Sequence, residues 1–509
     1  NQGANFIRVV QSLNSSTMLE YFDLNYFYEF LSPNWPPNPM LPNNDIDCFS
    51  WDPWHLYEDL FWPYLETELF DAWNLNTGSP EIIVANLDNG IFLEHYDLGD
   101  GHDGYSNIWT NSKEIPGNNI DDDNNGYVDD YYGWNFTTYY VNWGDNDVSH
   151  SIPQEYTHGS MTGSIIAAKT NNGPTYNEFG VFGVAGGWGN RGVRLMNIKV
   201  GISHYTLAAS IPFAIEYACQ NGAKVVNMPF GGAYSQAVES EISYWNSRGV
   251  VFVAAVGNND SPYGITYPAN YDEVISVGAT QFKSNSEYRW FGYNNDYNWG
   301  SNFLENACAV DIMAPCSPMS ISAIGQDDFF WNTIDFYGNS NISSASTSAA
   351  CSFVSGVVAL MLSADPCLTP DEIRLILRET ADKLTGETEY EMYNYNSIPG
   401  AFGCSDKMGY GRINAKSALE SIITNRPIII SGVVEPWTND TSIFHNITIE
   451  QNGVLEINNC EISFAPEIKI IIHEGGTLIV NNSVLTGLCD ATWQGIEVWG
   501  NSSANQWPD

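Results

Sequence analysis

Between residues 81 and 384, short apolar segments alternate with segments of helical periodicity, and this alternation constrains the fold more than any other feature. Residues 81–88, with the sequence EIIVANLD, are typical of a buried parallel strand that ends in a carboxylate. Strands that alternate with helices predict an α/β fold with a doubly wound parallel sheet. In such a sheet, functional residues lie where the carboxyl ends of strands meet the amino ends of helices. Further strands are expected at 193–200, 224–232, 250–258 and 272–280, and helices at 161–169, 211–223, 349–366 and 368–384.

Three of the expected helices carry end signals. Gly222 is expected to end the helix that begins near residue 211, because glycine adopts the left-handed conformation that often follows a helix. The long apolar helix is expected to stop at Pro366, since proline cannot continue a helix. The next, amphipathic helix is expected to begin with Thr369 as its N-cap and Pro370 at its first helical position.

The charge balance excludes some classes of partner. The chain carries 60 acidic and 18 basic residues, a formal net charge of -42. Phosphate groups would be repelled, so nucleic acids and anionic membranes are not expected as partners. The same balance suits either a soluble protein with a strongly hydrated surface or a protein that binds divalent cations, and composition does not decide between them.

Length and composition predict more than one folded domain. The 509 residues exceed what one compact core usually holds, and with 43% hydrophobic and 14% aromatic residues the chain can build large cores. No run of eighteen apolar residues predicts a membrane span. The sequence begins at Asn1 without a charged and apolar leader, so any signal peptide is expected to have been removed already.

The texture of the sequence divides it into three parts. Residues 1–75 are rich in Trp, Tyr, Phe, Pro and Asn without a clear period, and we expect an irregular arm that packs on something larger. This arm is either a remnant of a pro-segment or part of the mature protein. Residues 76–424 form the predicted α/β domain. In residues 425–509, helical periodicity disappears and short alternating strands with Gly and Asn turns follow.

The last part of the chain contains an internal repeat. GVLEINNCEIS, from Gly453, aligns with GTLIVNNSVLT, from Gly476, which is a period of 23 residues. One coil of this length cannot bury its own apolar face, so stacked coils are implied, as in a β-solenoid. A small β-sandwich is the alternative, and two coils are few, so the array can be part of a longer one. The matched pairs are Leu455 and Leu478, Ile457 and Val480, Ile462 and Leu485, Asn458 and Asn481, and Asn459 and Asn482.

Three separate segments carry residues with catalytic chemistry. Asp88 ends the first strand of the α/β domain, His158 stands directly before a helix, and Ser348 stands at the start of the long apolar helix. Each alone is weak evidence, because an aspartate or serine in such a position is usually a cap or turn residue. Together they give the order Asp, His, Ser, with each residue at a junction between a strand and a helix.

In combination these segments resemble the subtilase family of serine proteases, over roughly residues 76–424. The resemblance implies that Asp88 orients the imidazole, that His158 acts first as general base and then as general acid, and that Ser348 is the nucleophile. A serine hydroxyl is a poor nucleophile until a neighbouring base accepts its proton. A neutral imidazole can accept that proton near pH 7 and return it to the leaving amine.

A fourth segment, VVFVAAVGNND, places Asn258 just after a strand and a glycine. The resemblance implies that the side-chain amide of Asn258 donates a hydrogen bond to the oxyanion of the tetrahedral intermediate. The second donor would be the backbone N–H of Ser348, at the positive end of its helix.

The resemblance also implies a substrate-binding edge made of two extended segments that hold the substrate as an added β-strand. Backbone pairing of this kind accepts many sequences, so cleavage within polypeptides is expected. Residues 267–269 resemble the family's turn near the specificity pocket, where the peptide bond before Pro268 would be cis; an ordinary proline turn is the alternative. The residues of the two edge segments are Pro229, Phe230, Gly231, Ala255, Val256 and Gly257.

Five positions depart from the family's pattern. None of the departures removes a reacting group, but they bear on the rate and on the shape of the pocket, and the change at residue 346 could alter the turn that presents Ser348. The departures are Asn89 for Ser or Thr, Ser160 for Thr, Pro229 for Ser, Ser346 for Gly and Ser352 for Pro.

An acidic segment at residues 117–130, GNNIDDDNNGYVDD, has the spacing of a calcium-binding loop. The twelfth position is Tyr132 instead of the usual glutamate, so Asp130 or a distant group would have to supply the missing ligand. A solvated acidic turn is the alternative. Bound Ca²⁺ would be structural, because acylation of a serine needs no metal. The expected ligands are Asp121, Asp123, Asn125, Tyr127 and Asp129.

The nine cysteines include no CxxC pair, which argues against a zinc ribbon or a thioredoxin-like site. Their odd number leaves at least one unpaired if the rest form disulfides, and an oxidising compartment is plausible. Cys367 and Cys404 bracket a helix-loop segment and are the candidate pair for one disulfide.

The sequence therefore predicts a serine endopeptidase that is secreted, extracellular or on the cell surface, of bacterial type, with polypeptides as substrates. Its tail, including the run WQGIEVWG, resembles solenoid segments of secreted bacterial peptidases and would bind a surface or further coils. A catalytically inactive subtilase scaffold that serves as an adhesin or binding module is the alternative, although such a scaffold would not need all four catalytic residues. A metallopeptidase is set aside, because none of the eight histidines belongs to an HExxH motif.

Overall fold

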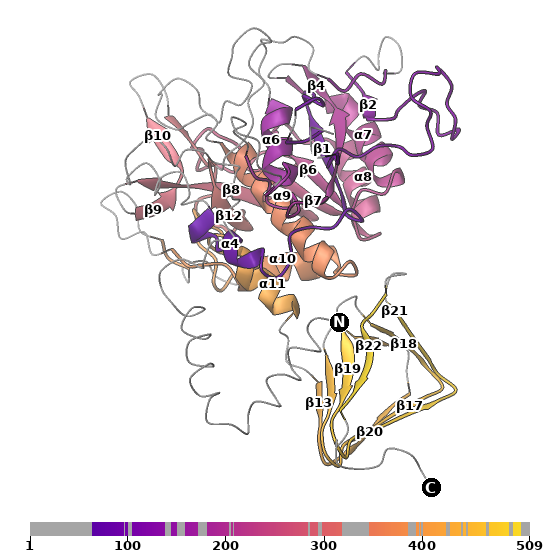
Figure 1. Ribbon diagram of the computed structural model, residues 1–509. Coiled ribbons are helices and arrows are strands. Elements are labelled where there is room, and N and C mark those ends of the chain that lie inside the picture. Colours follow the sequence, from indigo (N-terminus) through magenta and orange to yellow (C-terminus); the bar gives the residue numbers. More distant parts are fainter. Residues whose placement is uncertain are drawn as a thin grey trace, which may run out of the picture. The chain divides into compact units, whose positions relative to one another are not determined.

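The computed structural model describes most of the chain after residue 63, and Figure 1 shows these residues as a coloured ribbon. The predicted arm therefore lies outside the described residues up to position 63. The described residues are 64–95, 97–99, 104–137, 144–149, 158–171, 181–202, 205–206, 208–283, 286–293, 298–317, 346–384, 393–395, 398, 401–423, 428–438, 441–443, 446–464, 468–487 and 492–499.

A parallel sheet with the strand order β12-β8-β7-β6-β1-β3-β2 forms the centre of the α/β domain (Figure 1). The spatial order differs from the sequence order, so the chain crosses over between strands, and β9 adds one antiparallel strand beside β8. The predicted α/β class with a parallel sheet is confirmed. The strands are β1 (Ile83–Asp88), β2 (Gly133–Asn135), β3 (Arg194–Lys199), β6 (Val225–Met228), β7 (Val251–Ala255), β8 (Val274–Lys283), β9 (Ser286–Arg289) and β12 (Ile312–Pro315).

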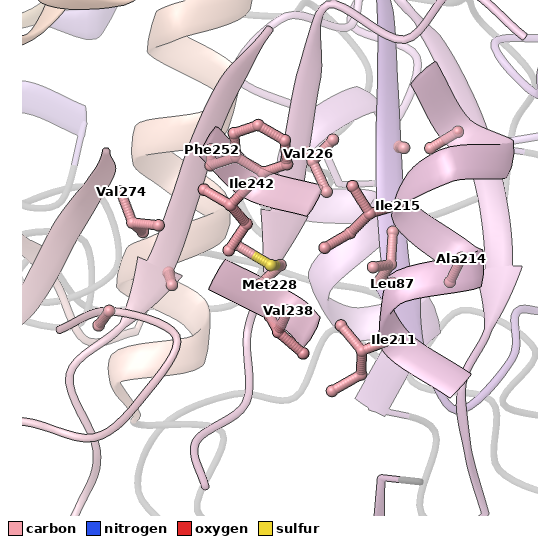
Figure 2. Close-up of a cluster of buried hydrophobic side chains, with 14 of the residues drawn as sticks. Leu87, Ile211, Ala214, Ile215, Val226, Met228, Val238, Ile242, Phe252 and Val274 are labelled. Atoms are coloured by element: carbon pink, nitrogen blue, oxygen red, sulfur yellow. The ribbon is translucent and has the colours of Figure 1, made fainter. Parts of the chain in front are cut away.

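Helices cover both faces of this sheet, because successive strand residues point to opposite faces. Val226 and Met228 of β6 join the buried apolar cluster that α7 and α8 cover (Figure 2). Asn227 between them faces the other side, where it is hydrogen-bonded to side chains of α9. Each fully buried apolar side chain contributes about 1.5–3 kcal/mol. The helices are α6 (His158–Ala167), α7 (Ile211–Gln220), α8 (Gln236–Asn246), α9 (Thr347–Ala364), α10 (Pro370–Glu379) and α11 (Ala415–Ile423).

Helix α9 is the core helix of the domain. By length and composition alone it could cross a membrane, and the described residues contain no second helix of that kind, but 94% of it is buried inside the protein. It packs against four parallel strands, β6, β7, β8 and β12. Ser346 caps its amino end by accepting a hydrogen bond from Ala349 N, and the helix ends at Ala364, before Pro366 as predicted.

The other predicted helix ends are also confirmed. Thr369 caps α10 through a reciprocal capping box with Glu372, and Pro370 is the first residue of that helix. Gly222, at φ +88°, follows the last turn of α7.

Residues 64–73 pack into the α/β domain. Tyr64 is fully buried and lies edge-on to Phe182, with their ring centroids 4.4 Å apart. The Trp73 indole donates a hydrogen bond to the Val184 carbonyl at 2.8 Å. The short helix α4 (Leu69–Ala72) packs against α11. The predicted boundaries at residues 75 and 424 stay predictions.

The tail contains three small parallel sheets, and none of them closes on itself. Strands in each sheet pair at the predicted spacing, so that Leu455 lies beside Leu478 and Ile462 beside Leu485. Inward-facing residues such as Ile457 are fully buried. The sheets are β13 (Ile428–Ile430), β16 (Ile447–Ile449), β19 (Lys469–Ile472) and β22 (Gly495–Val498); β14 (Val434–Trp437), β17 (Val454–Asn458) and β20 (Thr477–Asn481); and β15 (Thr441–Ile443), β18 (Glu461–Phe464) and β21 (Val484–Gly487).

The predicted pairing of Cys367 with Cys404 is wrong. Cys404 forms a disulfide with Cys308, 96 residues earlier in the chain, and their Cα atoms are 6.1 Å apart. Cys367 is itself disulfide-bonded. Chain spacing could not reveal this, because the fold brings residue 308, near the strand β12, to the loop that contains residue 404.

Candidate active site

The carboxyl end of β1 and the amino end of α6 bring Asp88 and His158 together. The His158 Nδ1 atom lies 2.9 Å from each oxygen of the Asp88 carboxylate. Asp88 is 8% exposed, so the carboxylate faces the ring in a largely dry environment. This contact fixes the orientation of the imidazole and favours the tautomer that carries its proton on Nδ1.

Two further donors hold the Asp88 carboxylate. The backbone N–H of Asn89 donates to Oδ1 at 2.7 Å, and the Thr162 hydroxyl donates to Oδ2 at 2.8 Å. Hydrogen bonds to a carboxylate favour its charged form, so these donors help to keep Asp88 ionised beside the ring. The sequence analysis missed Thr162, which lies one helical turn after His158 on the same face of α6.

Close packing sets α6 against the end of β1. The Asn89 side-chain oxygen accepts a hydrogen bond from Gly159 N at 3.0 Å, in the first turn of α6. A Cβ atom at Gly159 would lie only 2.1 Å from the Gly90 carbonyl oxygen. Glycine at this position therefore allows the helix to approach the strand closely enough for His158 to meet Asp88. Asn89, a departure from the family's pattern, serves here as a positioning residue.

The environment of His158 changes its pKa in two opposing ways. Burial alone lowers the pKa, because it disfavours the charged ring, whereas the negative charge of Asp88 and the hydrogen bond to it raise the pKa. The attraction to Asp88 prevails, and the pKa of His158 lies above its ordinary value of 6.5. A raised pKa makes the neutral ring a stronger base.

Ser348 is the second residue of α9 and is 6% exposed. Its hydroxyl donates to the Pro229 carbonyl oxygen at 2.7 Å, and among the described residues it forms no hydrogen bond with His158. Helices α6 and α9 pack against each other. Ser346, where the family has glycine, lies at φ −166°, an extended conformation that any residue adopts, so this departure leaves the turn before Ser348 unstrained.

Asn258 lies just beyond β7 and is oriented by Thr347. The backbone N–H of Thr347 donates to Asn258 Oδ1 at 2.9 Å, and the Thr347 hydroxyl donates to the same atom at 2.7 Å. A backbone N–H can only donate, so this contact identifies Oδ1 and turns the NH₂ group to the other side. Within the described part of the chain, Asn258 Nδ2 has no acceptor, and it remains available as a donor.

A buried polar network connects the elements that carry these residues. Asn227 Nδ2 donates to the Asn86 side chain at 2.9 Å and to the Ser352 hydroxyl at 3.2 Å. The Ser352 hydroxyl donates in turn to the Ser348 carbonyl at 3.0 Å, and Asn86 donates to Thr162 at 3.1 Å. Ser352, where the family has proline, thus joins a network that links β1, β6, α6 and α9. Buried networks whose members are all paired hold their elements rigidly.

The two predicted edge segments differ in their free backbone groups. Val256 has both backbone groups paired, its N–H to the Val277 carbonyl and its carbonyl to Thr266 N, each at 3.1 Å. Gly231 is exposed, and its N–H and carbonyl have no partner among the described residues. The peptide bond between Tyr267 and Pro268 is cis, which confirms that prediction.

The acidic loop gathers three carboxylates that suit a metal ion. Ligand oxygens of Asp121, Asp123 and Glu114 all lie within 4.8 Å of one another. Glu114 is 4% exposed, and its Oε2 has no hydrogen-bond partner. Several buried carboxylate oxygens with one orphaned atom fit a hard cation such as Ca²⁺. Sequence spacing missed Glu114, because it precedes the loop.

The other predicted ligands of this loop have side-chain roles within it. The Asp129 carboxylate accepts the backbone N–H groups of Asn118 and Asn119, at 3.2 and 2.6 Å. The Asn125 side chain accepts from Tyr127 N and donates to Asp130. The Tyr127 ring packs among buried aromatic rings, so only its backbone carbonyl could face a cation.

Comparison with known proteins gives the class to which this site belongs. A model of the subtilase family, peptidase S8, matches residues 79–411, about two thirds of the chain. The chain is 28% identical over 396 residues to "Thermophilic serine proteinase" of Bacillus sp. strain AK1, covering 77% of this chain and 75% of that protein. It is 30% identical over 237 residues to "Subtilisin DY" of Bacillus licheniformis, covering 46% of this chain and 73% of that protein.

A third relative is "Extracellular protease" of Xanthomonas campestris pv. campestris, which is 30% identical over 384 residues. That match covers 73% of this chain and 57% of the relative, so the chain spans little more than half of that protein. The family match and the two stronger relatives decide the question of class. The chain belongs to the subtilase family, whose members among these relatives are named as serine proteases.

Proposed function

We propose that this protein is a secreted serine endopeptidase that cleaves polypeptides through an acyl-enzyme on Ser348. The observation that carries the proposal is the contact between Asp88 and His158, because a buried carboxylate on Nδ1 prepares the other ring nitrogen to accept a proton. The family membership supports the same reading of the site.

The first step requires a small movement of Ser348. Its hydroxyl donates to the Pro229 carbonyl in the resting structure. Rotation about the Cα–Cβ bond of Ser348 would turn the hydroxyl toward Nε2 of His158. His158 would accept the proton while the oxygen attacks the scissile carbonyl carbon, and the imidazolium that forms would be stabilised by Asp88.

The negative charge then develops on the former carbonyl oxygen. Asn258 Nδ2 and the backbone N–H of Ser348, which has no acceptor within its helix, would donate to this oxyanion. His158 would return its proton to the leaving amine as the peptide bond breaks. A water molecule, activated by the same ring, would hydrolyse the ester and release Ser348.

The substrate would bind as an extended strand beside residues 229–231. Exposed backbone groups of Gly231 are available for such pairing. Because Val256 has both backbone groups occupied, residues 255–257 would instead contact the substrate's side chains.

Two features support a location outside the cytoplasm. The disulfide between Cys308 and Cys404 suits an oxidising compartment. The Xanthomonas relative is named as an extracellular protease, and all three relatives described above come from bacteria. We infer a secreted or cell-surface bacterial protein.

The acidic loop and the tail complete the proposal. Glu114, Asp121 and Asp123 would hold a structural Ca²⁺, which would remove the cost of the orphaned oxygen of Glu114. The tail would be a β-solenoid whose coils of 23 residues stack in parallel, and it would bind a surface or further coils.

Digestion of a peptide library, with the products identified by mass spectrometry, tests the proposed function. The protein should cut internal peptide bonds, and Ser348→Ala should cut none. An inactive scaffold would leave the library intact even when the protein is folded and supplied with Ca²⁺. Equal cleavage by Ser348→Ala would also contradict the proposal, because the activity would then belong to another residue or a contaminant.

A further inference from the structure

Two segments leave the sheet side by side and flank Ser348. β6 and β7 are neighbouring parallel strands, with Met228 beside Ala254. Beyond β6, the Pro229 carbonyl accepts the Ser348 hydroxyl; beyond β7, Asn258 is bonded to Thr347. A substrate carbonyl attacked by Ser348 would therefore lie between these segments, with its oxygen toward Asn258. The side chain of that substrate residue must enter the space between residues 229–231 and 255–257.

Thr266 occupies the floor of this space. Its backbone N–H donates to the Val256 carbonyl at 3.1 Å, and its hydroxyl lies 3.2 Å from the same oxygen. The next residue, Tyr267, pairs with Gly232 through two backbone hydrogen bonds, of 2.7 and 3.2 Å. The chain around Thr266 is thus hydrogen-bonded to both flanking segments, so the floor cannot move away without breaking these bonds.

The Thr266 side chain leaves little depth between the two segments. A Cβ atom added to Gly231 would lie 2.3 Å from Thr266 Oγ1 and 2.9 Å from its Cβ. A Cβ atom added to Gly257 would lie 3.1 Å from Thr266 Cγ2. Thr266 therefore contacts the backbone of both segments, and each of these two positions accepts only glycine or a local shift.

We propose that Thr266 closes the bottom of the pocket for the substrate residue that supplies the scissile carbonyl, and thereby selects small uncharged side chains such as Ala and Ser. This inference rests on the proposed function. The γ-methyl and hydroxyl groups of Thr266 fill the volume that a long or aromatic side chain would need. The hydroxyl also offers lone pairs at the floor, which would be left unpaired beneath a large apolar side chain.

The test measures kcat/KM for four succinyl-Ala-Ala-Pro-X p-nitroanilides, with X as Ala, Ser, Leu and Phe. Active enzyme is counted in each preparation by titration with a fluorophosphonate. The wild-type protein should prefer Ala and Ser over Phe by at least tenfold. Thr266→Gly should raise the ratio of Phe to Ala cleavage by about 10–100-fold, because removal of a side chain of this size opens room for the larger substrate.

Two further variants separate size from polarity and from loop damage. Thr266→Val keeps the volume and removes the hydroxyl, so it should still reject Phe. Ser261→Gly makes a comparable change in the same loop, where the Ser261 hydroxyl contacts only Tyr263 N, and it should keep the wild-type ratio.

The outcomes separate this inference from the proposed function. Fluorophosphonate labelling with efficient wild-type cleavage after Phe, or a ratio unchanged in Thr266→Gly, would overturn the inference alone. A folded protein that neither labels at Ser348 nor cleaves any of the four substrates would overturn the proposed function and this inference with it.

Discussion

The α/β domain and the tail reach buried cores by different routes. In the α/β domain, the candidate catalytic residues come from positions as far apart as 88 and 348, and crossover connections bring them to one edge of the sheet. In the tail, each buried residue stacks on the residue 23 positions away, as Asn458 does on Asn481. Long-range topology creates a site with several different chemistries, whereas a local repeat creates a regular surface. Damage to the first should abolish a reaction; damage to the second should only loosen a stack.

The largest effect should follow the loss of a group that acts on the reacting atoms. Asn258→Ala should lower kcat by about 10²–10³ with little change in KM, because its amide donates to charge that forms only in the transition state; this magnitude is the one known for the equivalent donor of subtilisin itself. Steady-state kinetics with a peptide substrate measures it. The neighbouring exposed Asn259, changed to Ala, is the matched control and should keep the wild-type rate. Equal losses in both variants would mean that the loop, and not the donor, is responsible.

In the tail, a buried residue should affect stability and leave catalysis unchanged. Ile457→Ala removes a fully buried side chain and should destabilise the tail by about 2–5 kcal/mol. Hydrogen exchange measured by mass spectrometry over residues 428–499 should report faster exchange. Glu456→Ala, on the same strand but the opposite face, should change exchange little. If kcat fell together with tail stability in Ile457→Ala, the two regions would not be independent.

The Ca²⁺ site proposed for the acidic loop should contribute a smaller stabilisation. At a free Ca²⁺ concentration about 100 times the Kd, binding adds about 2.7 kcal/mol to the free energy of unfolding. Chelation should therefore lower the Tm by several degrees, and Glu114→Gln should weaken the response to Ca²⁺. The exposed Glu81, changed to Gln, should keep the full response. A Tm independent of Ca²⁺ in the wild-type protein would remove the ion from the account.

The smallest effect concerns Thr162, a positioning residue. Thr162→Val removes the hydroxyl bond to Asp88 Oδ2, so we expect kcat to fall about tenfold at most. With fewer donors, Asp88 attracts the imidazolium more strongly, and the pKa of His158 should rise further. The acid limb of the pH profile should then move to higher pH. Thr162→Ser keeps the hydroxyl and should keep the profile; a merely structural role would lower activity without moving the limb.

The sequence predicted the main elements of the α/β domain because their signals are local. The strand that ends at Asp88 and the helix capped by Thr369 each follow from a few neighbouring residues. The spacing of 23 residues also predicted the register of the tail strands. In these cases residues adjacent in sequence, or one period apart, determine the structure.

What the sequence missed depends on contacts between distant segments. Glu114 joins Asp121 and Asp123 only because the loop folds back on it. The partner of Cys404 is Cys308, which no spacing rule selects. Asn227 and Ser352 are unremarkable polar residues in sequence, and their bond appears only when β6 and α9 pack together. Networks of this kind require the three-dimensional fold.

The most direct test of the catalytic assignment is the rate of fluorophosphonate modification of Ser348 as a function of pH. Only neutral His158 can accept the serine proton, so the rate should rise with pH and level off above the pKa of His158, with a midpoint above 6.5 because Asp88 raises that pKa. Mass spectrometry should locate the label on Ser348, and His158→Ala should react very slowly. Labelling at another residue, or a rate that does not depend on His158, would contradict the account.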